Sequence, residues 1–192
     1  MNVATSHPDF GVQLGVVPFD RSYVVLPGRL YGGFYPASHD ANGTIAKLER
    51  LVAVGIRHVV NLTEEGEGSR TAPLRDYFPE LGHVGDRLGA PISFRRFAIR
   101  DGGIPDVVGM VAALDEVDRA LAAGLPTYVH CWGGRGRTAT VLGCYLARHG
   151  HANGDRALAM IRYLRRTDGK AEAEAPETPV QKDFVRGWPV GR

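Results

Sequence analysis

The sequence is dominated by ten consecutive residues, Val129-His130-Cys131-Trp132-Gly133-Gly134-Arg135-Gly136-Arg137-Thr138. They separate a short apolar segment, residues 125–129, from a second apolar run, residues 138–146, and this pattern predicts a buried strand followed by a buried helix. The three glycines between these elements let the backbone curl until several N–H groups point inward. Such a nest at the N-terminus of a helix is typical of a site that holds a phosphate group.

Two side chains make this loop chemically reactive. Arg137 carries a planar, permanently charged guanidinium that can hold two phosphate oxygens while charge spreads in the transition state. Cys131 lies among inward N–H groups, at a helix N-terminus and near arginine, and such surroundings favour the nucleophilic thiolate. The alternative is a buried cysteine beside an incidental arginine, but it does not account for the glycines, His130 and Thr138 in the same stretch.

The motif His130-Cys131-x-x-Gly134-x-x-Arg137-Thr138 resembles the signature of cysteine-dependent protein tyrosine and dual-specificity phosphatases. The resemblance covers most of the chain and is to the smaller, dual-specificity-like branch. Segments that also look like parts of such domains are 31–36, 55–62, 97–105 and 178–181.

The resemblance implies a role for each residue of the motif. Cys131 would be the nucleophile, and Thr138 would ease departure of the thiolate, although a threonine at a helix start can instead bond its own backbone. His130 would support the loop, because a strand residue at this point directs its ring away from the phosphate. The residues expected to bind the substrate phosphate with Arg137 are Trp132, Gly133, Gly134, Arg135 and Gly136.

Cleavage of a phosphate ester also needs a proton for the leaving oxygen. Asp101 is the candidate general acid, because it ends a predicted strand before two glycines and a helix-opening proline, where a mobile loop could carry its carboxyl over the phosphate. The same pattern fits an ordinary turn aspartate, and the resemblance at residues 97–105 favours the catalytic interpretation. Asp106 is the alternative acid, although the first turn of a helix would also suit it.

Gln181 has two interpretations that the sequence leaves open. The resemblance implies a glutamine that lies near the site and positions water. Thr178-x-x-Gln181, with Pro179 at the first helical position, is also a helix capping box.

Strands and helices alternate along the chain, which predicts an α/β fold with a mostly parallel central sheet flanked by helices. By resemblance this is the cysteine-based phosphatase fold. We expect an extended lead-in over residues 1–22 and one catalytic domain over residues 23–192. Predicted strands cover residues 23–26, 30–33, 57–62, 92–99 and 125–129; predicted helices cover 44–54, 105–123, 138–146 and 153–166, and segment 63–90 is expected to be polar and irregular with one short helix.

Composition narrows the class of protein further. The 192 residues, 44% hydrophobic, can bury one substantial core. The net charge of +2 argues against a protein that mainly binds nucleic acid, although 20 arginines against 3 lysines leave fixed positive charge to place around a site. We expect no membrane span, no metal and no cofactor, and a cytoplasmic location, since Cys131 would need a reducing compartment. Cys144 is expected in the core.

These observations lead to one functional hypothesis with two alternatives. The leading hypothesis is a phosphatase that forms a cysteinyl-phosphate intermediate and acts on phosphotyrosine, phosphoserine or phosphothreonine in proteins. A phosphoinositide or inositol-phosphate phosphatase is the first alternative, because Arg135 adds a second cation to the loop. A phosphate-binding pseudophosphatase is the second, although a binding module has no use for both a nucleophile and an acid.

Overall fold

The central sheet has five strands in the part of the chain that the computed structural model describes, residues 15–69 and 72–192. In spatial order these are β1 (Ser22–Leu26), β2 (Leu30–Gly33), β7 (Thr127–His130), β3 (His58–Asn61) and β6 (Ser93–Arg96). β1 is antiparallel to β2, and the other neighbours are parallel. The sheet is therefore mostly parallel, which confirms the predicted fold class.

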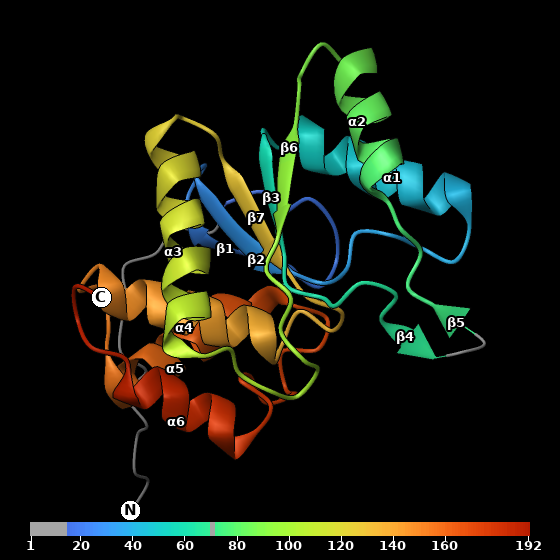
Figure 1. Cartoon of the computed structure of the whole chain (residues 1–192). Coiled ribbons are helices and arrows are strands. Elements are labelled where there is room, and N and C mark those ends of the chain that lie inside the picture. The colour runs from blue at the N-terminus through green and yellow to red at the C-terminus, as the bar shows by residue number, and fades with distance from the viewer. Residues whose placement is uncertain (1–14, 70–71) are drawn as a thin grey trace, which may run out of the picture.

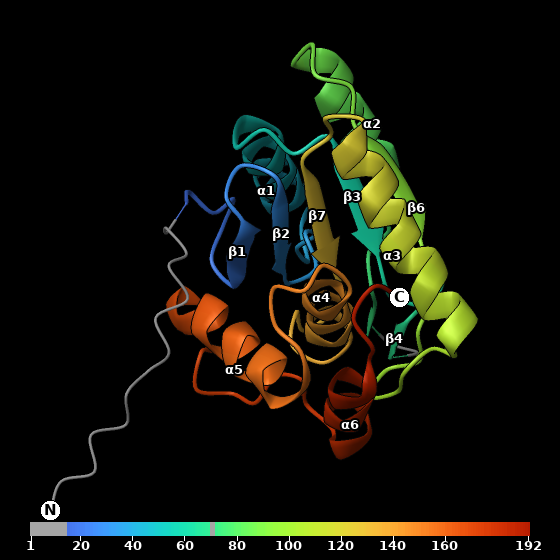
Figure 2. The same ribbon diagram turned by 90° about the vertical axis from the view of Figure 1, so that its left-hand side faces the viewer.

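Helices cover both faces of this sheet (Figure 1). On one face lie α1 (Ala41–Ala53) and α2 (Phe78–Arg87). On the other lie α3 (Val107–Ala122), α4 (Arg137–Arg148), α5 (Gly154–Leu164), which a 3-10 turn (Arg165–Thr167) extends, and α6 (Pro179–Gly187). Figure 2 shows the five strands spread side by side with α4 below the middle of the sheet. A small hairpin of β4 (Gly68–Ser69) and β5 (Ala72–Pro73) stands apart from the sheet.

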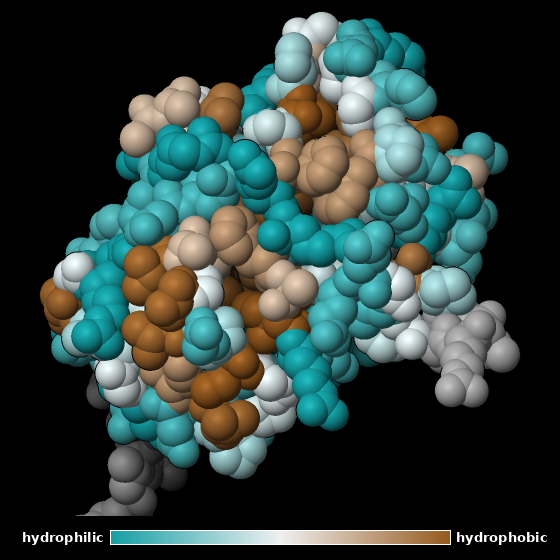
Figure 3. All heavy atoms as spheres, in the orientation of Figure 1, coloured by the Kyte–Doolittle hydropathy of each residue, from teal (hydrophilic) through white to brown (hydrophobic). Residues whose placement is uncertain are grey.

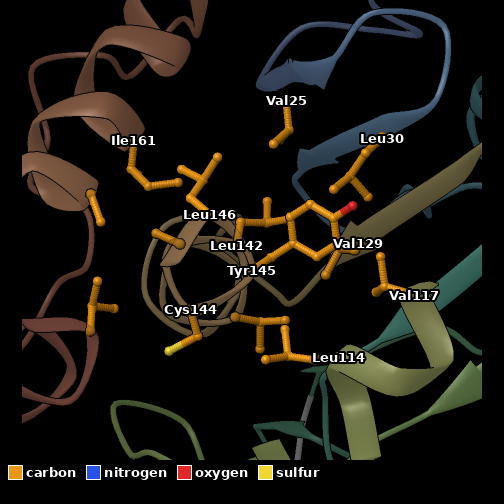
Figure 4. Close-up of a cluster of buried hydrophobic side chains, with 14 of the residues drawn as sticks. Val25, Leu30, Leu114, Val117, Val129, Leu142, Cys144, Tyr145, Leu146 and Ile161 are labelled. Carbon is orange, nitrogen blue, oxygen red and sulfur yellow. The ribbon is translucent and has the colours of Figure 1, made fainter. Parts of the chain in front are cut away.

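The protein has two hydrophobic cores, one on each face of the sheet, because successive side chains of a strand point to opposite faces. In β7, Tyr128 packs in the core under α1 and α2, whereas Val129 packs in the core shared by α3, α4, α5 and α6. α4 is buried from Arg137 to Ala147, and Leu142 and Leu146 lie at the centre of the second core (Figure 4). The helix that follows the glycine-rich loop is thus fixed on all sides.

Several predicted boundaries were wrong, mostly at helix starts. α1 begins at Ala41 because the Asp40 carboxylate accepts a hydrogen bond from Gly43 N at 2.7 Å and so caps the helix three residues earlier than predicted. α3 begins at Val107, after Asp106 rather than at Pro105. Segment 63–90 is more ordered than expected, with the β4–β5 hairpin and α2, whereas the predicted strand 92–99 shortens to β6.

Two further expectations concern the ends of elements and of the chain. α5 begins one residue after the predicted start at residue 153, because Asn153 occupies the N-cap position, and the Asn153 side chain makes no capping hydrogen bond. The predicted lead-in falls mostly on residues 1–14, which lie outside the described residues. Across the described ranges, no helix combines the length and the hydropathy needed to cross a membrane.

Candidate active site

The 131–137 loop lies at the edge of the sheet where its parallel strands end, between β7 and α4 (Figure 1). The register aligns the last residue of β7, His130, with Gly33 of β2 and with Asn61 of β3, and Asn61 with Arg96 of β6. Ligands of α/β proteins bind at this carboxyl edge, where loops from several strands meet. The sheet therefore brings residues far apart in sequence to the loop.

The loop is pressed against the connection that follows β2. Gly134 has φ +71°, and a Cβ there would lie 2.4 Å from the carbonyl carbon of Gly33, so both backbone conformation and space require glycine. Tyr35 N donates to Trp132 O at 3.1 Å. Arg21 Nη2 donates to Gly133 O at 2.9 Å. These contacts hold the carbonyls of Trp132 and Gly133 on the outside of the loop.

Cys131 lies at the base of this loop with its side chain 2% exposed. Its sulfur accepts a hydrogen bond from Gly134 N at 3.3 Å. An N–H directed at sulfur, together with the N-terminus of α4, stabilises negative charge on that atom. The Cys131 sulfur therefore lies at the centre of the loop beneath an inward N–H.

Arg137 is buried, with its side chain 1% exposed, and charged groups surround its guanidinium. Nη1 and Nη2 form a two-pronged ion pair with the Glu67 carboxylate at 2.5 and 2.6 Å, and Nη1 also donates to Ile99 O at 2.9 Å. Burial opposes the charge, but the hydrogen bonds to Glu67 and the nearby Cys131 outweigh it and raise the pKa of Arg137. Nε has no acceptor among the described residues, so one donor remains for a ligand.

Glu67 is a site residue that sequence reasoning missed. Glu64, Glu65 and Glu67 lie in segment 63–90, which was predicted to be polar and irregular, and Glu64 and Glu65 are indeed exposed. Glu67 differs from them: its side chain is only 8% exposed because it lies against Arg137. Its one sequence signal is its place among three neighbouring glutamates, and this signal does not tell which of them turns inward.

The two candidate acids occupy different environments. Asp101 Oδ1 lies 2.9 Å from Arg137 Nη2, and its side chain is 61% exposed, so its carboxyl stands at the mouth of the loop. Asp106 is engaged elsewhere, because its Oδ1 accepts a hydrogen bond from Gly109 N at 2.6 Å and caps α3. The structure thus brings Asp101, and not Asp106, to Arg137.

Thr138 begins the buried turn of α4 directly after Arg137, and its side chain is fully buried. Its hydroxyl has no hydrogen-bond partner among the described residues. It does not bond its own helix backbone, which was the alternative considered for this residue. A buried hydroxyl without a partner costs free energy, of the order of 1–3 kcal/mol, and is retained where a ligand or intermediate supplies the missing bond.

His130 is turned away from the loop interior, as its place at the end of a strand predicts. Its Nδ1 lies 3.1 Å from Cys131 O, and its Nε2 lies 2.5 Å from the hydroxyl of Tyr77. A carbonyl only accepts, so Nδ1 carries the proton and donates to Cys131 O, and Nε2 accepts from Tyr77. The ring therefore fixes the peptide group next to the cysteine.

Burial lowers the pKa of His130 from 6.5 to about 3. Between these two values the unfolded chain binds a proton at this ring and the folded protein does not, so stability falls as pH drops below 6.5. At pH 5 this group alone lowers the free energy of unfolding by about 2 kcal/mol relative to pH 7.

Urea unfolding of the wild type and of His130→Gln at pH 7 and pH 5 measures this effect. The pH-dependent loss should be smaller by that amount in the variant, since the contributions of His58 and His151, whose pKa values burial also lowers, cancel in the comparison. Equal losses in both proteins would contradict the neutral, buried ring.

Gln181 is part of the capping box of α6, and its side chain is fully buried. Its Oε1 accepts from Glu177 N and Thr178 N, while its Nε2 donates to Gly103 O at 3.0 Å. The hydroxyl of Thr178 donates to Gly102 O at 3.1 Å. The cap therefore also ties α6 to the two glycines that follow Asp101, a contact that the sequence did not suggest.

The remaining loop residues differ in their exposure and in their contacts with neighbouring residues. Arg135 forms an ion pair with Glu177, so its charge is already compensated. The Trp132 side chain is 42% exposed beside the loop. A Cβ at Gly136 would lie 2.5 Å from a carboxylate oxygen of Glu177, so only glycine leaves room for this arrangement.

The surface around the 101–105 segment is partly apolar. Figure 3 shows a largely hydrophilic face on which hydrophobic residues gather over the lower part of α3 and over α6. The exposed large hydrophobic residues of these two helices are Val107, Val108 and Val180.

Both cysteines are free, and only Cys131 lies at the site. Cys144 is fully buried in the core around α4, and burial raises the pKa of its thiol. Within the described ranges, no three His, Cys, Asp or Glu side chains are grouped so as to hold a metal ion.

Comparison with known proteins identifies the family. The family model described as PTP-SAK, Swiss Army Knife protein, DSP-PTPase phosphatase domain, matches residues 21–177. The chain therefore belongs to this family of cysteine-based phosphatases, which confirms the resemblance found in the sequence.

The individual relatives are similar to only part of the chain. Phosphatidylglycerophosphate phosphatase PTPMT2 of Arabidopsis thaliana is 31% identical over 116 residues, which are 60% of this chain and 46% of that protein. PTPMT1 of the same plant is 34% identical over 61 residues, 32% of this chain and 18% of that protein. The chain thus spans less than half the length of either relative.

Solved structures agree on the fold. The active form of Tk-PTP has a TM-score of 0.66 at 23% identity and covers 86% of this chain and 93% of its own. The kinase associated phosphatase KAP has a TM-score of 0.63 at 24% identity, with 81% and 83% covered. At these identities the likeness extends to the fold alone.

Proposed function

We propose that the protein hydrolyses phosphate monoesters through a cysteinyl-phosphate intermediate. The observation that carries the proposal is the meeting of three groups at one loop: the Cys131 sulfur under an inward N–H, the free Nε of Arg137, and the Asp101 carboxyl 2.9 Å from Arg137 Nη2. Nucleophile, anion-binding fork and proton donor are the parts that this chemistry requires.

In the first step the Cys131 thiolate attacks phosphorus, the S–P bond forms and the bond to the ester oxygen breaks. The phosphate would take the Nε–H of Arg137 and replace Asp101 at Nη2; the released Asp101 carboxylate, 61% exposed, then takes up a proton from solvent and gives it to the departing oxygen. The inward N–H groups of the loop and Arg137 stabilise the charge that spreads over the equatorial oxygens.

In the second step water attacks phosphorus, Asp101 takes a proton from it, and the S–P bond breaks. The Thr138 hydroxyl, which has no partner among the described residues, would donate to the departing sulfur and so stabilise the thiolate. Both ends of the Gln181 amide are already bonded, its oxygen within the cap and its nitrogen to Gly103 O. In this scheme Gln181 therefore positions the loop that carries Asp101.

The substrate we propose is a phosphorylated tyrosine, serine or threonine of a protein. Two observations support it: the family is of the dual-specificity type, and Glu177 compensates Arg135, the loop cation that a polyphosphorylated small molecule would need. A phosphoinositide or inositol-phosphate substrate is the second candidate. The names of two solved neighbours favour it, PTPMT1 in complex with PI(5)P and the PP-IP phosphatase SIW14. The phosphatidylglycerophosphate phosphatases among the relatives are named for another phosphorylated lipid, which has no inositol.

Release of inorganic phosphate from para-nitrophenyl phosphate tests the proposal. We expect steady turnover and competitive inhibition by vanadate, because a phosphate-shaped oxyanion fits the same nest and arginine. Vanadate that leaves the rate unchanged would contradict the loop as the reaction site. Phosphate-ester binding without any turnover would instead identify a pseudophosphatase.

A further inference from the structure

A groove of about 820 Å³ lies beside the 131–137 loop and is not used by the chemistry described above. It runs between the β2–α1 connection and the chain that leaves β5, and Trp132 of the loop forms part of its wall. In Figure 1 the β2–α1 connection is the light-blue segment that leads to α1. The lining residues are Phe34, Tyr35, Ala37, Ser38, His39, Asp40, Lys47, Pro73, Leu74, Arg75 and Trp132. A volume of this size accommodates a ligand of several hundred daltons.

Much of the wall is aromatic or aliphatic. Phe34, Tyr35, Leu74 and Trp132 present rings and methyl groups rather than charges, and the exposed face of Trp132 joins the groove directly to the loop. Such a wall suits amino-acid side chains or another partly apolar body. It does not suit a ligand that carries charge on all sides, because desolvating charge against apolar groups is costly.

Two cations stand at the Phe34 end of the groove. Lys47 Nζ lies 5.2 Å from the centre of the Phe34 ring, and the Arg21 guanidinium carbon lies 4.0 Å from the same centre. Arg21 also reaches the loop through Gly133 O. Gly133, Arg21, Phe34 and Lys47 thus form a continuous path from the loop into the groove.

Neither cation has a carboxylate partner within ion-pair distance among the described residues. Lys47 Nζ donates only to Ala37 O, at 3.2 Å, and the Nε of Arg21 is buried without an acceptor. Arg75, by contrast, is compensated by Glu80 at 2.6 Å. Burial and the nearby charge of Arg21 lower the pKa of Lys47, and Asp40 opposes them only in part, as expected of a lysine that lacks a full counter-ion.

We infer that this groove binds the peptide segment next to the phosphorylated residue, and that Lys47, with Arg21 behind it, pairs with an acidic side chain of that segment. The inference rests on the proposed function. A peptide fits better than an inositol polyphosphate, because the groove offers one uncompensated lysine within an apolar wall that also carries Asp40, and an anion with several phosphates would be repelled there.

Binding of phosphotyrosine peptides to the Cys131→Ser protein tests the inference without turnover. The peptides form a series in which each flanking position in turn carries Glu, Gln or Lys. At one or more positions we expect Glu to bind about fivefold more tightly than Gln, the upper range for a partly exposed ion pair. Lys47→Met on the same background should remove this preference, and Lys47→Glu should reverse it toward Lys-containing peptides.

Three controls separate the groove from the loop and from net charge. Lys47→Arg should keep the preference for Glu. Lys182→Met removes the same charge from a lysine of α6 that pairs with Glu174, and it should also leave the preference unchanged. Lys47→Met with Cys131 intact should hydrolyse para-nitrophenyl phosphate at the wild-type rate, because this ester has no flanking residues and methionine keeps the apolar stem against Phe34.

Several outcomes would overturn the inference. One is equal binding of Glu and Gln peptides at every position, and another is an equal effect of Lys47→Met and Lys182→Met. Loss of activity on phosphoinositide in phosphatidylcholine vesicles on Lys47→Met, with peptide binding unchanged, would assign the groove to a lipid headgroup instead. Failure of the proposed function looks different: the wild type would release no phosphate from any ester, while the peptide-binding series would still report on the groove.

Discussion

Cys131→Ser is expected to lower phosphate release by about a thousandfold or more while the folded protein still binds phosphate esters. A serine hydroxyl is hardly ionised at neutral pH, so the N–H of Gly134 has no thiolate to stabilise. The turnover of para-nitrophenyl phosphate measures the first effect. Competition by vanadate for a fluorescent phosphopeptide measures the second.

Cys144→Ser is the matched control, since it makes the same exchange of sulfur for oxygen at the other free cysteine. Cys144 is fully buried among apolar side chains, so we expect nearly unchanged turnover and a stability loss of roughly 1–3 kcal/mol for a poorly bonded hydroxyl. Two results would contradict Cys131 as the nucleophile. One is that Cys131→Ser keeps a tenth or more of the wild-type activity, and the other is that Cys144→Ser loses as much activity as Cys131→Ser.

Asp101→Asn should slow the cleavage of esters with poor leaving groups by about a hundredfold or more, the upper part of what general acid catalysis contributes. An amide cannot donate the proton that an alkoxide or phenolate of high basicity needs. Esters that leave readily should be affected far less. The rate of each variant across a series of aryl phosphates gives both results.

Asp106→Asn provides the control, because asparagine also caps helices and Asp106 accepts a hydrogen bond from Gly109 N. It should behave like the wild type across the whole series. A leaving-group dependence in Asp106→Asn, together with a uniform loss in Asp101→Asn, would make Asp106 the acid.

The part of the site that could be predicted from the sequence is local. Cys131, the glycines and Arg137 occur within seven positions, and two apolar runs predict the strand and the helix on either side. The geometry of the loop therefore depends on one continuous stretch of sequence. The prediction of Asp101 required one further inference, namely that its loop returns to the edge of the sheet where the 131–137 loop lies. The ion pair at 2.9 Å to Arg137 agrees with that placement.

The parts that could not be predicted depend on contacts between distant segments. Glu67 faces Arg137 across 70 positions of sequence, and nothing in the spacing of the three glutamates distinguishes it. α2 was only loosely foreseen, because Gly82 and Gly85 within it have low helix propensity and Tyr77 at its start makes no side-chain cap. Packing of Leu81 and Val84 in the core under α1 stabilises that helix.

The ion pair between Glu67 and Arg137 also has a consequence for the entropy of substrate binding. A free arginine side chain loses about 2 kcal/mol of rotamer entropy when it is fixed. Here Glu67 fixes both terminal nitrogens and Ile99 O holds one of them further, so this cost falls on folding and not on the encounter with a phosphate. The incoming anion meets a guanidinium with a single orientation and an unused Nε–H, and the binding free energy that would have ordered the side chain remains for the reaction.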